Sequence, residues 1–243
     1  MIYFSLIFLV YLLFLLSLRI VVNIKYDKIL NIETRGLRDW DKTGQYHRTE
    51  STPYLALKAL VSEYKFNNDD KMIDYGAGKG RVSLFVHNKI GISITGVEIN
   101  EFTYKEALAN LASYKHINNI KQDKKVRFVK EYAENYKIND ENTFFFFNPF
   151  SSDIFKKVVD NIIDNANQYD KEVKIILYYP TKKYKDFLKT TPFTIKQKIK
   201  PKGSISPREM FIIYKYKGVH QSWLRRQSSF PLEVRKAVDI DKE

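Results

Sequence analysis

A glycine-rich loop between two short apolar runs constrains the fold of this 243-residue chain more than any other feature. The first run, residues 72–75, contains Asp74, and glycines follow at the alternate positions 76, 78 and 80. A helix-compatible segment then leads into a second apolar run, which contains Glu98. This order predicts a strand, a tight loop, a helix and a second strand, which is the building unit of a parallel α/β sheet.

Each part of this unit suits a nucleotide-like ligand. Glycine has no Cβ, so the loop can turn tightly and bring its backbone close to a ligand. A helix that starts near Gly80 directs its free N–H groups and the positive end of its dipole into the loop. Glu98 lies about 20 residues after the loop, where nucleotide-binding α/β folds place a carboxylate that binds ribose hydroxyls.

The glycine spacing departs from two common nucleotide motifs. The dinucleotide fingerprint has its third glycine one residue later, and the phosphate-binding loop needs Ser or Thr after its lysine, whereas Lys79 precedes Gly80. The pattern Asp74-x-Gly-x-Gly-x-Gly80 resembles motif I of the class I S-adenosylmethionine-dependent methyltransferases. A glycine-rich turn in another Rossmann-like domain is the alternative. The resemblance implies S-adenosylmethionine as cofactor, with Asp74 beside its methionine part and Glu98 on its ribose. The implied cofactor-binding set is Asp74, Gly76, Ala77, Gly78, Gly80, Glu98 and Ile99.

Residues 125–129 read as a third strand, and the loop after it is expected near the adenine. In the family, an acidic or polar residue of this loop contacts the adenine amine. Tyr132 and Ala133 align best with that position, and the usual Asp is missing. The resemblance therefore implies that Tyr132 and Ala133 border the adenine, with Glu131 as a substitute acid.

A run of phenylalanines that ends in Asn148-Pro149-Phe150 is the second strong signal. An apolar run without alternation is typical of a strand buried on both faces. Its terminal triplet resembles motif IV of the amine-directed methyltransferases, shortened by one proline. There the Asn side chain and a backbone carbonyl accept hydrogen bonds from the acceptor amine. The resemblance gives Asn148, Pro149 and Phe150 the catalytic positioning role and places Asn148 at the cofactor as well. An Asn-Pro pair that only ends a core strand is the alternative.

The resemblance covers roughly residues 46–215 and implies a Rossmann-like, seven-stranded, mostly parallel sheet. A strand over 173–179 and a closing pair over 193–195 and 210–214 would complete it, with the last strand antiparallel at the sheet edge. Ser51 or Thr52 is expected to cap a helix that has Pro53 in its first turn, and Asn100 is expected to cap the helix after the second strand.

The N-terminus predicts one transmembrane helix. Residues 2–18 are apolar except for two serines, and residues 2–22 suffice to cross a bilayer core. Arg19, Lys25 and Lys28 follow on the carboxyl side, and positive charge stays cytoplasmic. We therefore expect a single-pass anchor with a cytoplasmic catalytic domain. A buried core helix is the alternative, although this segment offers no polar face.

The expected organisation is an anchor over 1–24, a linker and cofactor lid over 25–52, a methyltransferase domain over 53–216 and a charged tail over 217–243. The absence of cysteine excludes a disulfide framework, a thiolate metal site and a cysteine nucleophile. No cluster with metal-ligand spacing is present, so no metal is expected. The net charge of +13 attracts nucleic acid, anionic lipid and acidic proteins, but the lysines form no dense block.

These features predict a membrane-anchored, S-adenosylmethionine-dependent methyltransferase that acts on an amine. A protein lysine is the favoured acceptor, because an N-terminal membrane segment before such a loop resembles the mitochondrial lysine methyltransferases that modify membrane proteins. A nucleic-acid or small-molecule acceptor stays open. The rival interpretation is a membrane-tethered, methyltransferase-like binding or scaffold protein without catalysis.

Overall fold

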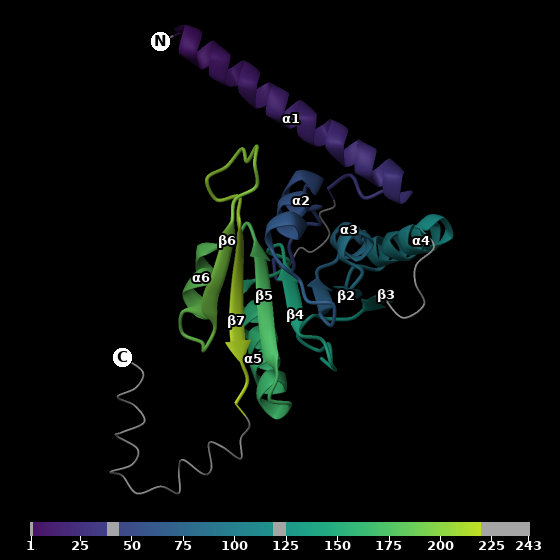
Figure 1. The fold of residues 1–243 in the computed structure, drawn as a ribbon, viewed down its shortest axis with the longest axis vertical. Helices are drawn as coiled ribbons and strands as arrows, with labels where there is room; N and C mark the ends of the chain where they lie inside the picture. The colour runs from purple at the N-terminus through teal and green to yellow at the C-terminus, as the bar shows by residue number, and fades with distance from the viewer. Residues whose placement is uncertain (1, 38–43, 119–124, 220–243) are drawn as a thin grey trace, which may run out of the picture.

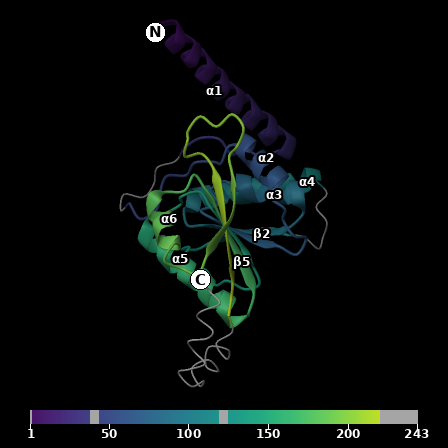
Figure 2. The ribbon, with the colours of Figure 1, turned by 60° about the vertical axis from the view of Figure 1, so that its left-hand side comes forward.

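The computed structural model describes residues 2–37, 44–118 and 125–219, which form a central sheet between two layers of helices (Figures 1 and 2). The sheet order is β3-β2-β1-β4-β5-β7-β6. Its strands are β1 (Lys71–Tyr75), β2 (Ser93–Glu98), β3 (Val126–Lys130), β4 (Thr143–Phe146), β5 (Glu172–Tyr178), β6 (Thr194–Ile199) and β7 (Phe211–Lys217). The helices are α1 (Ile2–Leu30), α2 (Tyr54–Glu63), α3 (Arg81–Ile90), α4 (Glu101–Asn118), α5 (Ser152–Gln168) and α6 (Lys182–Leu188).

The strand directions confirm the expected Rossmann-like sheet. Strands β1 to β5 pair in parallel, and β7 runs antiparallel to both β5 and β6. The expected edge position of the last strand is wrong, because β7 lies between β5 and β6. The burial of the two strands agrees with this order: residues 211–214 of β7 are buried, whereas β6 is mostly exposed, its two lysines included. Lysines on an edge strand also discourage pairing with other chains.

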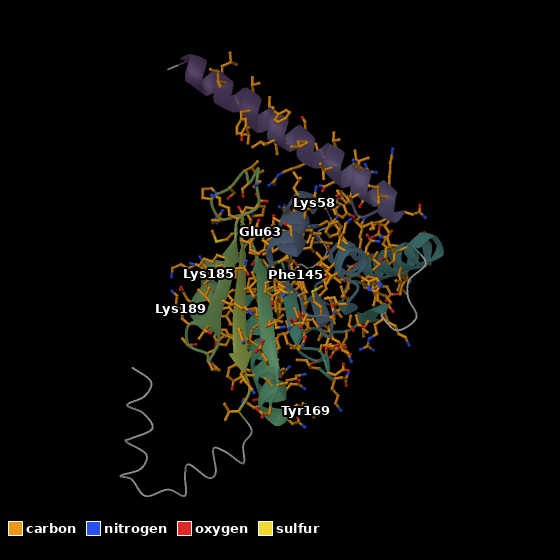
Figure 3. The ribbon with its side chains drawn as sticks, in the orientation of Figure 1. Lys58, Glu63, Phe145, Tyr169, Lys185 and Lys189 are labelled. Atoms are coloured by element: carbon orange, nitrogen blue, oxygen red, sulfur yellow. The ribbon has the colours of Figure 1, made fainter. Side chains whose placement is uncertain are left out.

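The phenylalanine run shows why β4 lacks a polar face. Successive side chains of a strand point to opposite sides of the sheet. Phe145 packs in the core beneath α2 and α3, while Phe144 and Phe146 pack in the core on the side of α5 and α6. Figure 3 places Phe145 in the interior, whereas Lys185 of α6 and Lys189, just after that helix, lie at the periphery. Burial on both faces therefore accounts for the uninterrupted apolar sequence.

The helix caps were only partly predictable. Asn100 caps α4 as expected, since its Oδ1 accepts a 2.9 Å hydrogen bond from the Thr103 backbone N–H. The expected cap of α2 by Ser51 or Thr52 is wrong, because α2 begins at Tyr54 and Pro53 occupies the cap position. Ser51 Oγ donates instead to the Thr34 carbonyl at 2.6 Å. The Tyr54 N–H finds its acceptor on α1, where Asn23 Oδ1 lies 3.1 Å away.

Helix α1 has two distinct parts. Its N-terminal part projects from the domain (Figure 1) and exposes large apolar side chains such as Leu13 and Phe14. Its C-terminal part packs on the domain, where Asp27 and Leu30 are buried. Among the described residues, α1 is the one helix whose length and apolar composition would allow it to cross a membrane. Of the expected tail over 217–243, residues 220–243 lie outside the described residues.

Candidate functional site

A central cavity lies at the carboxyl ends of β1, β2 and β4, under the segment 46–52 that passes over them. It encloses about 720 Å³ of space between atoms, its mouth included. We call residues 46–52 the strap. Besides strap residues, the cavity is lined by Asp74, Gly76, Ala77, Gly78, Arg81, Val82, Val97, Glu98, Ile99, Glu131, Ala133, Phe145, Phe147, Pro149 and Phe150.

The glycines of the β1–α3 loop are required by close contacts. Gly76 has a φ of 72°, and a Cβ there would lie 2.3 Å from Cβ of Pro149. Gly78 has a φ of 55°, and a Cβ there would lie 2.9 Å from Cγ2 of Thr49. Because L side chains rarely adopt these angles, only glycine lets the loop approach both Pro149 and the strap. Gly80 differs from these two glycines, because it faces the Phe128 ring at the start of α3 and does not line the cavity.

Glu98 joins the loop to the end of β2. Its Oε2 accepts a 2.9 Å hydrogen bond from the Gly78 N–H, and its Oε1 accepts one of 2.8 Å from the Asn100 N–H. Burial raises the pKa of Glu98, and the backbone donors partly oppose this shift. An ionised carboxylate has about four lone-pair sites, so these two bonds leave acceptor capacity for a ligand.

Asp74 is the second buried carboxyl group of the cavity. Ser83 Oγ, from the first turn of α3, donates to its Oδ2 at 2.7 Å. Burial raises the pKa of Asp74 to about 7, with a smaller contribution from the nearby Glu98 and an opposing one from Ser83. This group is therefore poised to change its charge when a cation approaches.

The two residues expected at the adenine have different positions. Ala133 is buried and lines the cavity, whereas the side chain of Tyr132 is 47% exposed and is not part of the lining. The Tyr132 ring lies beside the Tyr46 ring of the strap, with centroids 5.9 Å apart. Glu131, considered as the substitute acid, also lines the cavity.

Asn148 occupies a strained turn after β4. Its φ is 43°, and the φ of Tyr179, at the end of β5, is 50°. Asn148 Nδ2 donates a 2.6 Å hydrogen bond to the Tyr179 carbonyl, so its Oδ1 points elsewhere. Pro149 and Phe150 line the central cavity, while Asn148 lines a neighbouring one. Positive φ at residues other than glycine costs energy and concentrates at functional sites.

The strap is bound directly to the Asn-Pro-Phe triplet. The backbone N–H of His47 donates to the Pro149 carbonyl at 2.9 Å, and its Nδ1–H donates to the Asn148 carbonyl at 2.7 Å. Tyr46 pairs with Phe150 in an antiparallel bridge, and its hydroxyl donates to Glu134 at 2.6 Å. The contacts of His47 with the triplet were missed from sequence, because they join residues about 100 positions apart.

The neighbouring cavity, called the second cavity here, has about 1130 Å³ of space between atoms. It shares His47, Arg48, Glu50 and Phe147 with the central cavity. Its other lining residues come from the ends of β4 and β5, the β6–β7 loop and two further segments: Arg19, Pro53, Asn148, Tyr178, Tyr179, Ile205, Ser206 and Glu209. The two cavities therefore meet beneath the strap, next to Asn148.

Comparisons with known proteins identify the architecture. No family model matches the sequence, and no curated protein does either. Among solved structures, a human methyltransferase 10 domain containing protein is similar at a TM-score of 0.51 and 12% identity, covering 84% of this chain and 97% of that one. An RNA methyltransferase from Salinibacter ruber, in complex with S-adenosyl-L-homocysteine, has a TM-score of 0.51 at 13% identity, covering 70% of this chain and 94% of that one. The chain has the class I methyltransferase fold.

A putative methyltransferase from Escherichia coli, yhhF, agrees, with a TM-score of 0.50 at 16% identity over 71% of this chain and 93% of that chain. Identities this low establish the methyltransferase fold alone. Within the residues that the structure describes, no group of three or more His, Cys, Asp or Glu side chains is arranged to hold a metal ion.

Proposed function

We propose that this chain is an S-adenosylmethionine-dependent methyltransferase. One observation carries the proposal: the buried Glu98 carboxylate, at the end of β2, accepts a hydrogen bond from Gly78 in the glycine loop. A second buried carboxyl group, Asp74, faces the same cavity from β1. The fold by itself hosts many functions, so the argument rests on these groups.

The cavity fits the cofactor in several places. Glu98 has acceptor capacity left for the ribose hydroxyls, and Asp74 can pair with the ammonium group of the methionine part. Thr52 Oγ1 is buried in the cavity wall without a hydrogen-bond partner among the described residues, so it is available to a ligand. Ala133 supplies an apolar wall next to the expected adenine position. When bound, S-adenosylmethionine supplies a methyl group on a sulfonium ion.

An amine is the acceptor that the Asn148 geometry supports best. Because a carbonyl can only accept, the contact with Tyr179 commits the Asn148 Nδ2 and leaves Oδ1 as an acceptor for an amine N–H. Such a bond would hold the nitrogen lone pair in line with the methyl group, and alignment of this kind accounts for much of an enzymatic rate. The rings of Phe147, Tyr178 and Tyr179 in the second cavity suit the aliphatic stem of a lysine. A protein lysine is therefore the proposed acceptor.

Helix α1 is proposed to anchor the enzyme in a membrane as a single pass. Among its described residues, large apolar side chains such as Leu13 and Phe14 are exposed, and only 6% of its most apolar 18-residue window is buried. Lys25 and Lys28 follow on the carboxyl side, and positive charge stays cytoplasmic. The catalytic domain would then face the cytoplasm.

Calorimetric titration of the full chain in detergent with S-adenosylmethionine tests the proposal. We expect micromolar binding that Glu98→Ala abolishes and that Glu101→Ala leaves unchanged, since Glu101 is a half-exposed carboxylate only three residues away. Absence of binding by the unmodified chain would refute the proposal. Incubation with methyl-labelled cofactor and separate pools of membrane protein, RNA and small amines would then identify the acceptor. Binding without transfer to any pool would favour the scaffold interpretation.

A further inference from the structure

The loop between β6 and β7, residues 200–210, lies beneath the middle of α1 (Figures 1 and 2). One guanidinium nitrogen of Arg19 lies 2.6 Å from each carboxylate oxygen of Glu209 and 3.3 Å from the Gly203 carbonyl. Leu15 also reaches the loop, within van der Waals distance of a Cβ built at Gly203. Because Glu209 is buried, this contact fixes the loop to the helix.

The length of the projecting part of α1 sets the depth of this loop. Residues 2–18 of a helix rise about 26 Å, at about 1.5 Å per residue, which approaches the roughly 30 Å of a bilayer core. If α1 is an anchor, as proposed above, the segment before Arg19 occupies the hydrocarbon region. Arg19 then lies at the boundary, and the loop that it binds lies at the level of the headgroups.

The exposed chemistry of the loop suits that position. Its exposed charged residues are Lys200, Lys202 and Arg208, whose guanidinium also lies 5.6 Å from the centre of the Tyr179 ring. Its one acidic residue, Glu209, is buried and bound to Arg19. Ile205 places an apolar side chain, 40% exposed, among these cations. Basic residues attract anionic lipid headgroups, and an exposed apolar residue among them can enter the interface. The high lysine content of the whole chain does not explain why Glu209, the one acidic residue of this loop, is buried.

We propose that residues 200–208 form a second membrane contact, which binds anionic phospholipid headgroups. This inference rests on the proposed membrane anchor. Ile205, Ser206 and Glu209 also line the second cavity beside Asn148. The contact therefore sets the mouth of that cavity at the bilayer surface, so that an acceptor amine reaches Asn148 from the membrane interface.

The absence of cysteine allows single fluorophore labels at chosen positions. The exposed Pro207 is replaced by cysteine to report on the loop, and Tyr169, at the far end of α5 (Figure 3), serves as the control position. The full chain is reconstituted in phosphatidylcholine vesicles, with or without phosphatidylglycerol, that carry a nitroxide quencher on the headgroup. We expect severalfold stronger quenching at position 207 than at 169, and only with the anionic lipid.

Charge variants test the cations themselves. Joint Lys200→Gln, Lys202→Gln and Arg208→Gln substitution should reduce quenching at position 207 to the level at 169. Removal of the same charge from α6 and its C-cap, by Lys183→Gln, Lys185→Gln and Lys189→Gln, should leave the quenching at position 207 unchanged. A label at Leu9→Cys reports separately on the anchor, because it is quenched by acyl-chain nitroxides if α1 enters the bilayer. If that label is quenched but positions 207 and 169 are quenched equally in anionic vesicles, the loop contact is refuted and the anchor is not. An unquenched label at position 9 would refute the anchor and, with it, this proposal.

Discussion

The side-chain amide of Asn148 donates a 2.6 Å hydrogen bond to the backbone carbonyl of Tyr179, and both residues have a positive φ. The bond joins the ends of β4 and β5 at the point where the two cavities meet. It also sets the direction of the amide, because only Nδ2 can donate to a carbonyl. The Nδ2 of Asn148 thus stabilises the strained backbone of both turns, while the Oδ1 of the same side chain is proposed to bind the acceptor amine.

Replacement of Asn148 by glycine separates the backbone role from the side-chain role. Glycine adopts a positive φ freely, so folding and cofactor binding should be preserved. Loss of Oδ1 should lower methyl transfer on the order of 100-fold, because alignment of the amine is lost. Asn31→Gly is the matched control, since Asn31 also has a positive φ of 53° but lies at the end of α1. Equal transfer rates for the two variants would remove Asn148 from the proposed mechanism.

The approach of Gly76 to Pro149 predicts an unusually damaging alanine substitution. Gly76 and Gly91 both have positive φ, but a Cβ at Gly76 meets Pro149 at 2.3 Å, whereas nothing lies within 4 Å of one at Gly91. Gly91→Ala should lower the free energy of unfolding by about 1–2 kcal/mol, from conformational strain alone. Gly76→Ala should cost clearly more and also weaken cofactor binding. Chemical denaturation and calorimetry on both variants measure the difference.

Asp74 predicts a pH dependence of stability with a definite sign. The pKa of Asp74 is raised from 3.8 to about 7 by burial, so between these values the folded state keeps a proton that the unfolded chain has lost. The contribution of Asp74 is therefore most favourable at low pH and falls as the pH rises toward 7, by up to about 1.4 kcal/mol per unit. Asp74→Asn cannot ionise and should lose this slope, relative to the unmodified chain, in denaturation measured from about pH 5 to pH 8. The exposed Asp153→Asn should keep it.

The ion pair between Arg19 and Glu209 predicts strong coupling between α1 and the domain. Arg19→Met leaves the buried Glu209 without its cation and should cost about 3–5 kcal/mol of unfolding free energy. The double variant Arg19→Met/Glu209→Gln should recover most of this loss, since no buried charge stays uncompensated. Lys28→Met, an exposed change on the same helix, is the control. If Arg19→Met and Lys28→Met have the same free energy of unfolding in detergent, α1 and the domain are not coupled through this ion pair.

Local patterns in the sequence predicted the parallel part of the sheet and its glycine loop. The loop glycines, Glu98 and the apolar run of β4 follow from short-range rules of turn geometry and burial, and these features appear in the structure. The cap by Asn100 follows from the same kind of rule.

Contacts between distant segments were beyond such rules. Neither the edge position of β6 nor the contact of His47 with Asn148 leaves a local signature. The cap of α2 was mispredicted because its acceptor, Asn23, belongs to a different helix. Ala133 lines the central cavity whereas the adjacent Tyr132 does not, and the role of Tyr132 at the adenine stays a prediction.

The contacts at the end of α1 bear on whether the proposed anchor could be exchanged for another apolar helix. A plain tether can be exchanged for any apolar helix of similar length without consequence for the enzyme behind it. Here, the C-terminal part of α1 is bonded to the domain at three places. Arg19 forms an ion pair with Glu209, and the Asn23 side chain accepts a hydrogen bond from the first turn of α2. Asp27 accepts hydrogen bonds from the hydroxyl groups of Thr34 and Tyr54. Grafts or truncations that treat residues 19–30 as part of the anchor would remove contacts that hold the folded domain together, so the useful cut for such chimaeras precedes Arg19.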